Sequence, residues 1–342
     1  MHVGAGGADP VPVVALDAMG GDRAPAEIVA GALAAAEQLD VEILLAGPPE
    51  VLAEHLPGGE PPPRIRLLPA SEVVEMGDEP ASAIRTKKDS SLVRCAEAVR
   101  DGHAQAMVGA GNTGATMAAA LLRLGRIRGV QRPAIAVPVP VPGSDRRSLL
   151  LDVGATVDPA PEWLVQWAVL GREFARIRLG VAEPTVGLLS NGEEAGKGDD
   201  LRKRASALLA ETKGFAGNVE GRDLLRATTD VVVTDGFTGN VALKTLEGAL
   251  LGLAGLVFSV VDEPGADWAA SAELLKLRLL GAAAPLLPDN TGGAVLLGVN
   301  GICVISHGSS SAAAIVNAVR VARDSVTAGT VARLAEAVSG AG

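Results

Sequence analysis

Four polar, glycine-rich segments of this chain each follow directly on a short apolar run. Glycine-rich backbone amides beside a helix start form a cradle for anions, because their N–H groups point at the ligand. A tight turn that needs glycine for positive φ is the alternative explanation of any one such segment. Four together favour binding of an anion such as phosphate. The segments are Asp17–Asp22, Gly109–Gly114, Ser190–Gly198 and Asp235–Asn240.

The segment Gly109–Gly114 has the spacing G-x-G-x-x-G, which is also the dinucleotide-binding fingerprint. A nicotinamide site needs an acidic residue about 20 positions later to bind the ribose. Residues 115–144 contain no Asp or Glu, so NAD is disfavoured. An NADP site that uses Arg123, Arg126 or Arg128 remains an alternative.

Lys197 lies among glycines in a loop that resembles a P-loop but is one residue short, and Gly198 stands where Mg²⁺ would need Ser or Thr. The lysine could neutralise a phosphate or an oxyanion, and a solvated charged loop explains it equally well. Arg85, Lys87 and Lys88 form a second basic group, which by itself is more typical of a solvated face.

His307 stands in a Gly- and Ser-rich segment, residues 306–311, between a predicted strand and a predicted helix. It could act as an acid, a hydrogen-bond donor or a capping partner, and Ser309 to Ser311 would also serve as helix caps. The chain has no G-x-S-x-G, no H-E-x-x-H and no close Cys/His group. A serine hydrolase elbow and a zinc site are therefore disfavoured.

Alternating short apolar runs and Ala/Leu-rich segments must position these loops. This alternation predicts an α/β protein with a mainly parallel sheet covered by helices, whose ligands gather at the carboxyl ends of the strands. Strands are predicted at 11–16, 41–45, 104–108, 134–139, 148–151, 185–189, 230–233 and 301–306, and helices at 24–38, 90–100, 113–124, 162–177 and 201–211. We expect one domain over residues 11–335, a flexible tail at 1–10 and a helical projection at 244–290.

The composition excludes several classes of function. A net charge of -10 and the absence of Tyr argue against nucleic-acid binding, which needs basic faces and aromatic stacking. Cys95 and Cys303 are too far apart in sequence for a metal knuckle, and both are expected to be buried. The first ten residues lack the pattern of a signal peptide, so a cytosolic setting is expected.

Read together, these segments resemble the bacterial phosphate acyltransferase (PlsX) family, whose hallmarks occur here in order over about residues 11 to 325. No single segment is specific to this family, but the occurrence of all of them in the same order along the chain is. The matching stretches are 14–22, 83–91, 110–115, 132–134, 151–155, 217–223, 235–240, 296–301 and 307–310.

The resemblance implies a homodimeric three-layer α/β/α sandwich, similar to phosphate acetyltransferases and to isocitrate or isopropylmalate dehydrogenases. It implies no metal and no organic cofactor. Inorganic phosphate would attack a long-chain acyl thioester on acyl carrier protein, giving free carrier and acyl phosphate for phospholipid synthesis. The product would pass to a membrane-bound glycerol-3-phosphate acyltransferase of the PlsY type, so we expect a cytoplasmic enzyme peripherally associated with the inner face of the cell membrane.

Phosphate is itself a nucleophile, so the protein needs only to hold two anionic reactants and stabilise an oxyanion. We expect a phosphate cradle and charge partners, groups that stabilise the oxyanion or thiolate, and further substrate contacts from the loops that contain Asp17 and Asp235. The phosphate site is assigned to Gly111, Asn112, Thr113, Gly114 and Arg85; the catalytic groups to Lys197, Asn240 and His307; and substrate contacts to Asp17, Gly20, Gly21, Asp22 and Asp235.

Three positions depart from the family pattern: Gly109 where Ser is usual, Thr156 where Asn is common, and the interruption at 288–291. None is expected to abolish activity, because backbone amides can carry most of the phosphate binding. An NADP-dependent decarboxylating dehydrogenase and a non-catalytic, membrane-associated scaffold of lipid synthesis remain alternatives.

Two surfaces are expected to meet partners. Arg123, Arg126, Arg128 and Arg132 form the densest basic group and would dock the acidic carrier protein. The apolar stretch 249–261 is shorter than the roughly 20 residues that span a bilayer, so it is expected to pack in a dimer or to lie on the membrane surface.

Overall fold

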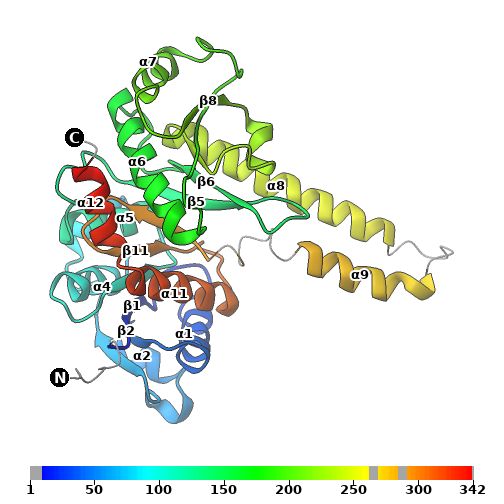
Figure 1. Ribbon diagram of the computed structural model, residues 1–342. Coiled ribbons are helices and arrows are strands. Elements are labelled where there is room, and N and C mark those ends of the chain that lie inside the picture. The colour runs from blue at the N-terminus through cyan, green and yellow to red at the C-terminus, as the bar shows by residue number, and fades with distance from the viewer. Residues whose placement is uncertain (1–9, 262–268, 284–289, 291, 341–342) are drawn as a thin grey trace, which may run out of the picture.

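The computed structural model describes residues 10–261, 269–283, 290 and 292–340, and within them eleven strands form one sheet (Figure 1). The order across the sheet is β3-β2-β1-β4-β11-β10-β5-β6-β9-β7-β8. The strands are β1 (Val13–Asp17), β2 (Glu42–Gly47), β3 (Ile65–Pro69), β4 (Ala106–Gly109), β5 (Ala134–Pro140), β6 (Arg147–Leu151), β7 (Val186–Leu189), β8 (Phe215–Val219), β9 (Val231–Val233), β10 (Ala294–Leu297) and β11 (Ile302–Ile305).

Helices cover both faces of this sheet, which confirms the predicted three-layer α/β architecture. Alternate strand residues face opposite layers: Val14 and Leu16 join one buried cluster, and Ala15 joins the other. The helices are α1 (Ala26–Gln38), α2 (Pro49–Ala53), α3 (Pro80–Thr86), α4 (Ser91–Arg100), α5 (Thr113–Arg123), α6 (Pro161–Arg178), α7 (Asp200–Leu209), α8 (Gly236–Val261), α9 (Ala269–Ala283), α11 (Ala312–Thr327) and α12 (Thr330–Ser339).

The sheet contains two parallel blocks that run in opposite directions. Strands β3, β2, β1, β4 and β11 form one block, and β6, β9, β7 and β8 form the other. Between them, β10 is antiparallel to both β11 and β5, and β5 is antiparallel to β6. The predicted strands were found close to their expected places, whereas β3, β8 and β10 were not anticipated.

The register of the central strands aligns the ends of the two blocks. Val304, near the end of β11, pairs with Val295, which pairs with Ala136. Ala136 pairs with Leu151, the last residue of β6, which pairs with Val233, the last residue of β9. The carboxyl ends of both blocks therefore meet along one line at the centre of the sheet, where ligands of such folds collect.

Helix α8 begins at this line and leaves the body of the protein with α9 beside it, forming an arm (Figure 1). Large apolar side chains along the arm are exposed, among them Leu251, Leu253 and Leu256 on α8 and Leu274 and Leu277 on α9. The apolar stretch 249–261 forms the second half of α8, which has 26 residues. By length and composition alone, α8 would suffice to cross a membrane.

The first turn of α8 packs against the segment that follows β6. A Cβ atom at Gly239 would lie 1.9 Å from the carbonyl oxygen of Asp152, and one at Gly236 would lie 2.6 Å from its Oδ2. Only glycine permits this approach, so the two glycines of residues 235–240 fix the root of the arm against the sheet.

We expect Gly239→Ala to destabilise the protein by roughly 3 kcal/mol, because the added methyl overlaps the Asp152 backbone, which is held by its hydrogen bond to the Thr234 carbonyl oxygen. Gly248→Ala in the same helix is the matched control, since nothing lies within 4 Å of a Cβ there. Alanine at that site should stabilise by about 0.5–1 kcal/mol through helix propensity. Urea unfolding measures both, and equal stabilities of the two variants would contradict the close approach.

Candidate active site

A cavity of about 450 Å³ opens where the two sets of carboxyl ends meet. Its walls come from the loops after β1, β4, β6 and β11, from the central strands, and from the first turns of α5 and α8. Polar lining residues are Asp22, Thr113, Asn240, Lys244, Glu247, Ser306, His307 and Ser310, and apolar ones include Met76, Val137, Val153, Leu243 and Ile305.

The start of α5 forms one wall, and Asn112 caps it. The Oδ1 atom of Asn112 accepts a hydrogen bond from the Ala115 N–H at 3.0 Å, and its amide donates to the carbonyl oxygens of Met76 and Asp78. The Asn112 side chain is thus occupied by protein groups. The N–H groups of Thr113 and Gly114, which have no partner within the helix, remain at a positive helix end beside the cavity.

His307 and its neighbouring serines form the adjoining wall. The Ser309 N–H donates to Nδ1 of His307 at 3.3 Å, and the Ser309 hydroxyl lies 2.8 Å from the same nitrogen. Since a backbone N–H can only donate, Nδ1 accepts, and the neutral ring carries its proton on Nε2. In the described part of the chain nothing accepts from Nε2, so this N–H is available to a ligand.

Two buried hydroxyls brace the same loop. Ser310 donates to the carbonyl oxygen of His307 at 2.6 Å, and the hydroxyls of Ser306 and Ser310 lie 2.7 Å apart. The proton of Ser310 is thereby used, so Ser306 donates to Ser310. The loop is held rigidly enough to place the His307 ring.

The opposite wall is one face of α8. Asn240, Leu243, Lys244 and Glu247 follow the i, i+3, i+4, i+7 spacing of a helix face, and all four line the cavity. The ammonium of Lys244 pairs with Glu247 at 2.8 Å. Among the described lining residues, Lys244 is the one with a permanent positive charge. Sequence reasoning missed it, although its position four residues after Asn240 was a usable sign.

The loop after β1 contributes to the cavity wall and contacts the His307 loop. Asp22 lines the cavity, and its N–H donates to the carbonyl oxygen of Gly308. Gly21 has φ +107°, and a Cβ there would lie within 2.8 Å of the carbonyl oxygens of both Ala110 and Gly308. Three loops distant in sequence therefore meet at Gly21, which explains the glycine requirement.

Asp17 lies beneath this junction and is buried. Burial raises the pKa of its carboxyl, although hydrogen bonds from Ser91 and from the N–H groups of Met19 and Gly20 oppose the shift. A Cβ at Gly20 would lie 2.7 Å from the Asp17 Oδ2. Asp17 and Gly20 shape the loop, and neither is among the cavity-lining residues.

Asp235 is also buried, and it binds Arg202 rather than facing the cavity. The Arg202 guanidinium contacts Asp235 Oδ2 at 2.5 Å and also bonds Thr234, Thr238 and the carbonyl oxygen of Leu189. Burial acts to raise the pKa of Asp235, but hydrogen bonds from Thr238 and Arg202 outweigh it and hold that pKa below its ordinary value. This network ties the start of α8 to α7.

Lys197 and Arg85 lie outside the cavity lining. Both side chains are exposed, and neither has a hydrogen bond or ion pair within the described residues. Their assigned roles stay predictions.

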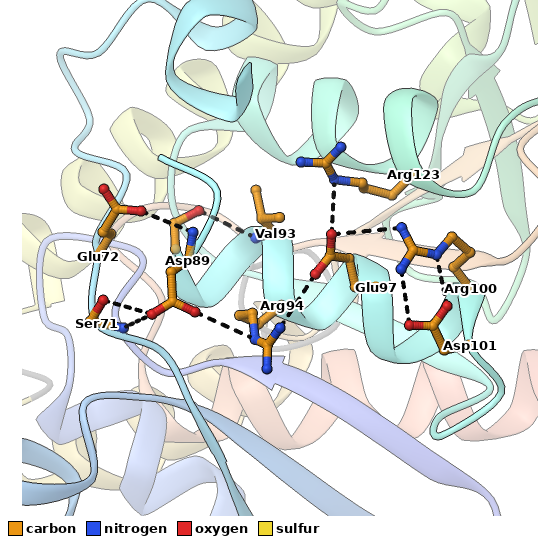
Figure 2. A network of polar contacts seen from close by, with 10 residues as sticks. Ser71, Glu72, Asp89, Val93, Arg94, Glu97, Arg100, Asp101 and Arg123 are labelled. Atoms are coloured by element: carbon orange, nitrogen blue, oxygen red, sulfur yellow. Dashed lines mark hydrogen bonds and ion pairs between the residues drawn. The ribbon is translucent and has the colours of Figure 1, made fainter. Parts of the chain in front are cut away.

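The predicted carrier-docking arginines lie at the far end of α5 from the cavity. Arg123 is partly neutralised by Glu97, which also contacts Arg94 and Arg100 at 3.5–3.6 Å (Figure 2). Arg132 lies over the Trp163 ring, 5.2 Å from its centre. Partly exposed pairs of this kind contribute little stability.

Within the described residues, no group of three or more His, Cys, Asp or Glu side chains could hold a metal ion. Cys95 and Cys303 are buried and free, as predicted. The interruption at 288–291 falls, apart from Asn290, outside the described residues.

Comparisons with known proteins agree with this geometry. A family model described as "Fatty acid synthesis protein" matches residues 13–333. A phosphate acyltransferase of Desulfitobacterium hafniense (strain DSM 10664 / DCB-2) is 49% identical over 328 residues, covering 92% of this chain and 94% of that protein. A phosphate acyltransferase from Geobacillus sp. (strain WCH70) is 46% identical over 330 residues, covering 95% of this chain and 98% of that protein. This chain belongs to the phosphate acyltransferase family.

The enzyme is therefore an acyltransferase. Its fold is shared with solved structures of low sequence identity: a phosphotransacetylase from Streptococcus pyogenes has a TM-score of 0.60 at 15% identity, covering 92% of this chain and 94% of that one. A branched-chain phosphotransacylase from Enterococcus faecalis V583 has a TM-score of 0.55 at 15% identity, covering 92% of this chain and 98% of that one. The predicted likeness to phosphate acetyltransferases is confirmed at the level of fold.

A buried carboxyl supports the cleft. Asp152 is fully buried, and its oxygens accept hydrogen bonds from the N–H groups of Ile135, Ala155 and Thr156 at 2.7–3.1 Å. Burial raises its pKa from 3.8 to about 6, although these hydrogen bonds oppose the shift. Because the folded state favours the protonated acid, this residue's contribution to stability is fully present below pH 4 and is lost as the pH rises through 6.

We expect the stability of the wild type relative to Asp152→Asn to fall by roughly 3 kcal/mol between pH 4 and pH 7, because asparagine does not titrate. Urea unfolding of both proteins across this range isolates the effect, since the other titrating groups cancel in the difference. Parallel pH profiles would show that Asp152 titrates normally.

Proposed function

We propose that the enzyme transfers a long-chain acyl group from acyl carrier protein to inorganic phosphate, and that the acyl phosphate feeds phospholipid synthesis. The observation that carries this proposal is the composition of the cavity. Helix-start amides, the Nε2–H of His307 and the Lys244 ammonium line one space, and apolar side chains, among them Val137, Val153 and Leu243, line other parts of it. Such a site suits one anionic and one apolar reactant.

In the proposed reaction, a phosphate oxygen attacks the thioester carbonyl carbon. The new C–O bond forms as the carbonyl becomes an oxyanion, and its collapse breaks the C–S bond and releases the carrier thiolate, which takes up a proton. The amides of Thr113 and Gly114 and the Lys244 ammonium hold the phosphate. His307 and Asn240 lie on facing walls, where their N–H groups donate to the oxyanion.

No covalent nucleophile or strong general acid is required of the protein. Phosphate supplies the attacking oxygen, and a thiol with a pKa of about 8.5 leaves readily near neutral pH. Catalysis then rests on positioning and on donors fixed before the reaction.

Lys244→Gln should lower kcat/KM for phosphate by about tenfold or more, since it removes the cation that balances the phosphate charge. Acyl phosphate is measured by mass spectrometry after incubation of carrier-bound acyl chain with phosphate. Lys213→Gln is the matched control, because Lys213 is an exposed lysine paired with Glu183 outside the cavity. If the two variants behave alike, Lys244 does not bind phosphate; if the wild type forms no acyl phosphate, the proposed reaction is wrong.

The proposal extends to the arm. The exposed apolar residues of α8 and α9 exceed what a solvated helix pair needs, so they suit a second copy of the chain, a membrane surface, or both. We propose that the base of the arm dimerises and that its tip lies on the inner membrane surface, where a membrane-bound glycerol-3-phosphate acyltransferase takes the product.

Leu253→Glu should reduce flotation with anionic lipid vesicles while the variant remains a dimer that turns over soluble substrate. Leu253 is 59% exposed on the arm, and the control Leu208→Glu changes a residue 42% exposed on α7. Flotation and light scattering give the two readouts. Unchanged flotation of Leu253→Glu would remove the membrane role of this residue, and loss of the dimer would assign it to packing.

A further inference from the structure

A second cavity, of about 710 Å³, is separate from the cavity proposed as the catalytic cleft. It is placed at the amino ends of β6 and β9, between the β5–β6 connection, the end of α6 and the middle of α11. None of its lining residues also lines the cleft. Four arginines drawn from three separate segments converge on it, namely Arg146, Arg147, Arg178 and Arg320.

The described residues balance this positive charge only in part. Among the described lining residues, the carboxylates are Asp145, which is exposed, and Asp230, whose Oδ2 already accepts two hydrogen bonds from Thr185. Arg146 donates to the Ala227 carbonyl oxygen. Within the described residues, the guanidinium groups of Arg147 and Arg178 have no hydrogen bond or ion pair.

The arginines also repel one another. Burial lowers the pKa of Arg178, and Arg147 and Arg320 lower it further against the opposing charge of Asp324. Like charges gathered in a partly buried space are unfavourable unless an anion joins them. A planar guanidinium binds two phosphate oxygens at once, which lysine does not.

We propose that this cavity is a second anion site that binds a small ligand carrying phosphate groups with at least two negative charges. Its volume lies within the range of small-molecule sites, and is larger than a single phosphate needs. The site adjoins the cleft through the backbone: Gly292 lines this cavity and Gly293 lines the cleft. On α11, Asn317 faces the anion site and Ala314, one turn earlier, lines the cleft.

Inorganic pyrophosphate, titrated calorimetrically into the full-length enzyme, serves as the probe. We expect saturable binding that weakens at least tenfold in Arg147→Gln and in Arg178→Gln. Arg128→Gln is the matched control, because Arg128 is exposed, lies outside both cavities and changes the net charge equally. Binding should weaken steeply with salt, as expected for clustered charges.

Lys244→Gln removes the cation of the phosphate site in the cleft, lies outside the second cavity, and should leave the arginine-dependent binding unchanged. If pyrophosphate binding is lost in Lys244→Gln but kept in both arginine variants, the anion occupies only the cleft and the proposal is wrong. Absence of saturable binding to the wild type would also overturn it. Without anion, Arg178→Gln should unfold at the same or a higher temperature than the wild type, because a repelling charge is removed; a lower temperature would contradict the charge argument.

Discussion

The candidate active site depends on the antiparallel strands at the centre of the sheet. An ordinary parallel sheet places all its carboxyl ends on one edge, and its loops face solvent there. Here three antiparallel pairs, β11–β10, β10–β5 and β5–β6, join two parallel blocks, and their register stops both blocks at one line. Loops from two oppositely directed blocks therefore face each other across a cavity rather than lying side by side.

This arrangement requires that the segments at the meeting point of the two blocks be fixed to one another, and Asp152 makes contacts that do so. Its carboxyl accepts hydrogen bonds from three backbone N–H groups, and its own N–H donates to the Thr234 carbonyl oxygen. Its carbonyl oxygen lies against Gly239. The segment after β6, the end of β9 and the start of α8 are held by this one residue. A raised pKa is the consequence of placing a carboxyl in the core for this purpose.

The sequence predicted most elements because their signals are local: helix periodicity, strand alternation and glycine-rich ends. It missed β10, which follows two glycines and reads as a loop, and it could not show strand direction, because register is decided between residues far apart in sequence. For the site, the position of a motif indicated nearness to the cavity but not which side chain faces it. Asp17 and Asp235 belong to such motifs yet are buried beneath the loops, whereas Lys244 lies beyond the motif and faces the cavity.

The same helix that closes the cleft also carries the apolar arm. The face of α8 from Asn240 to Glu247 lines the cavity, and the exposed leucines begin at Leu251, the next turn along. On the proposed reaction, the product carries a polar phosphate and a long apolar chain, and these two parts match the two halves of α8. Because one rigid helix joins them, the acyl chain can leave along an apolar surface without crossing open water, which would cost about 0.8 kcal/mol for each exposed methylene.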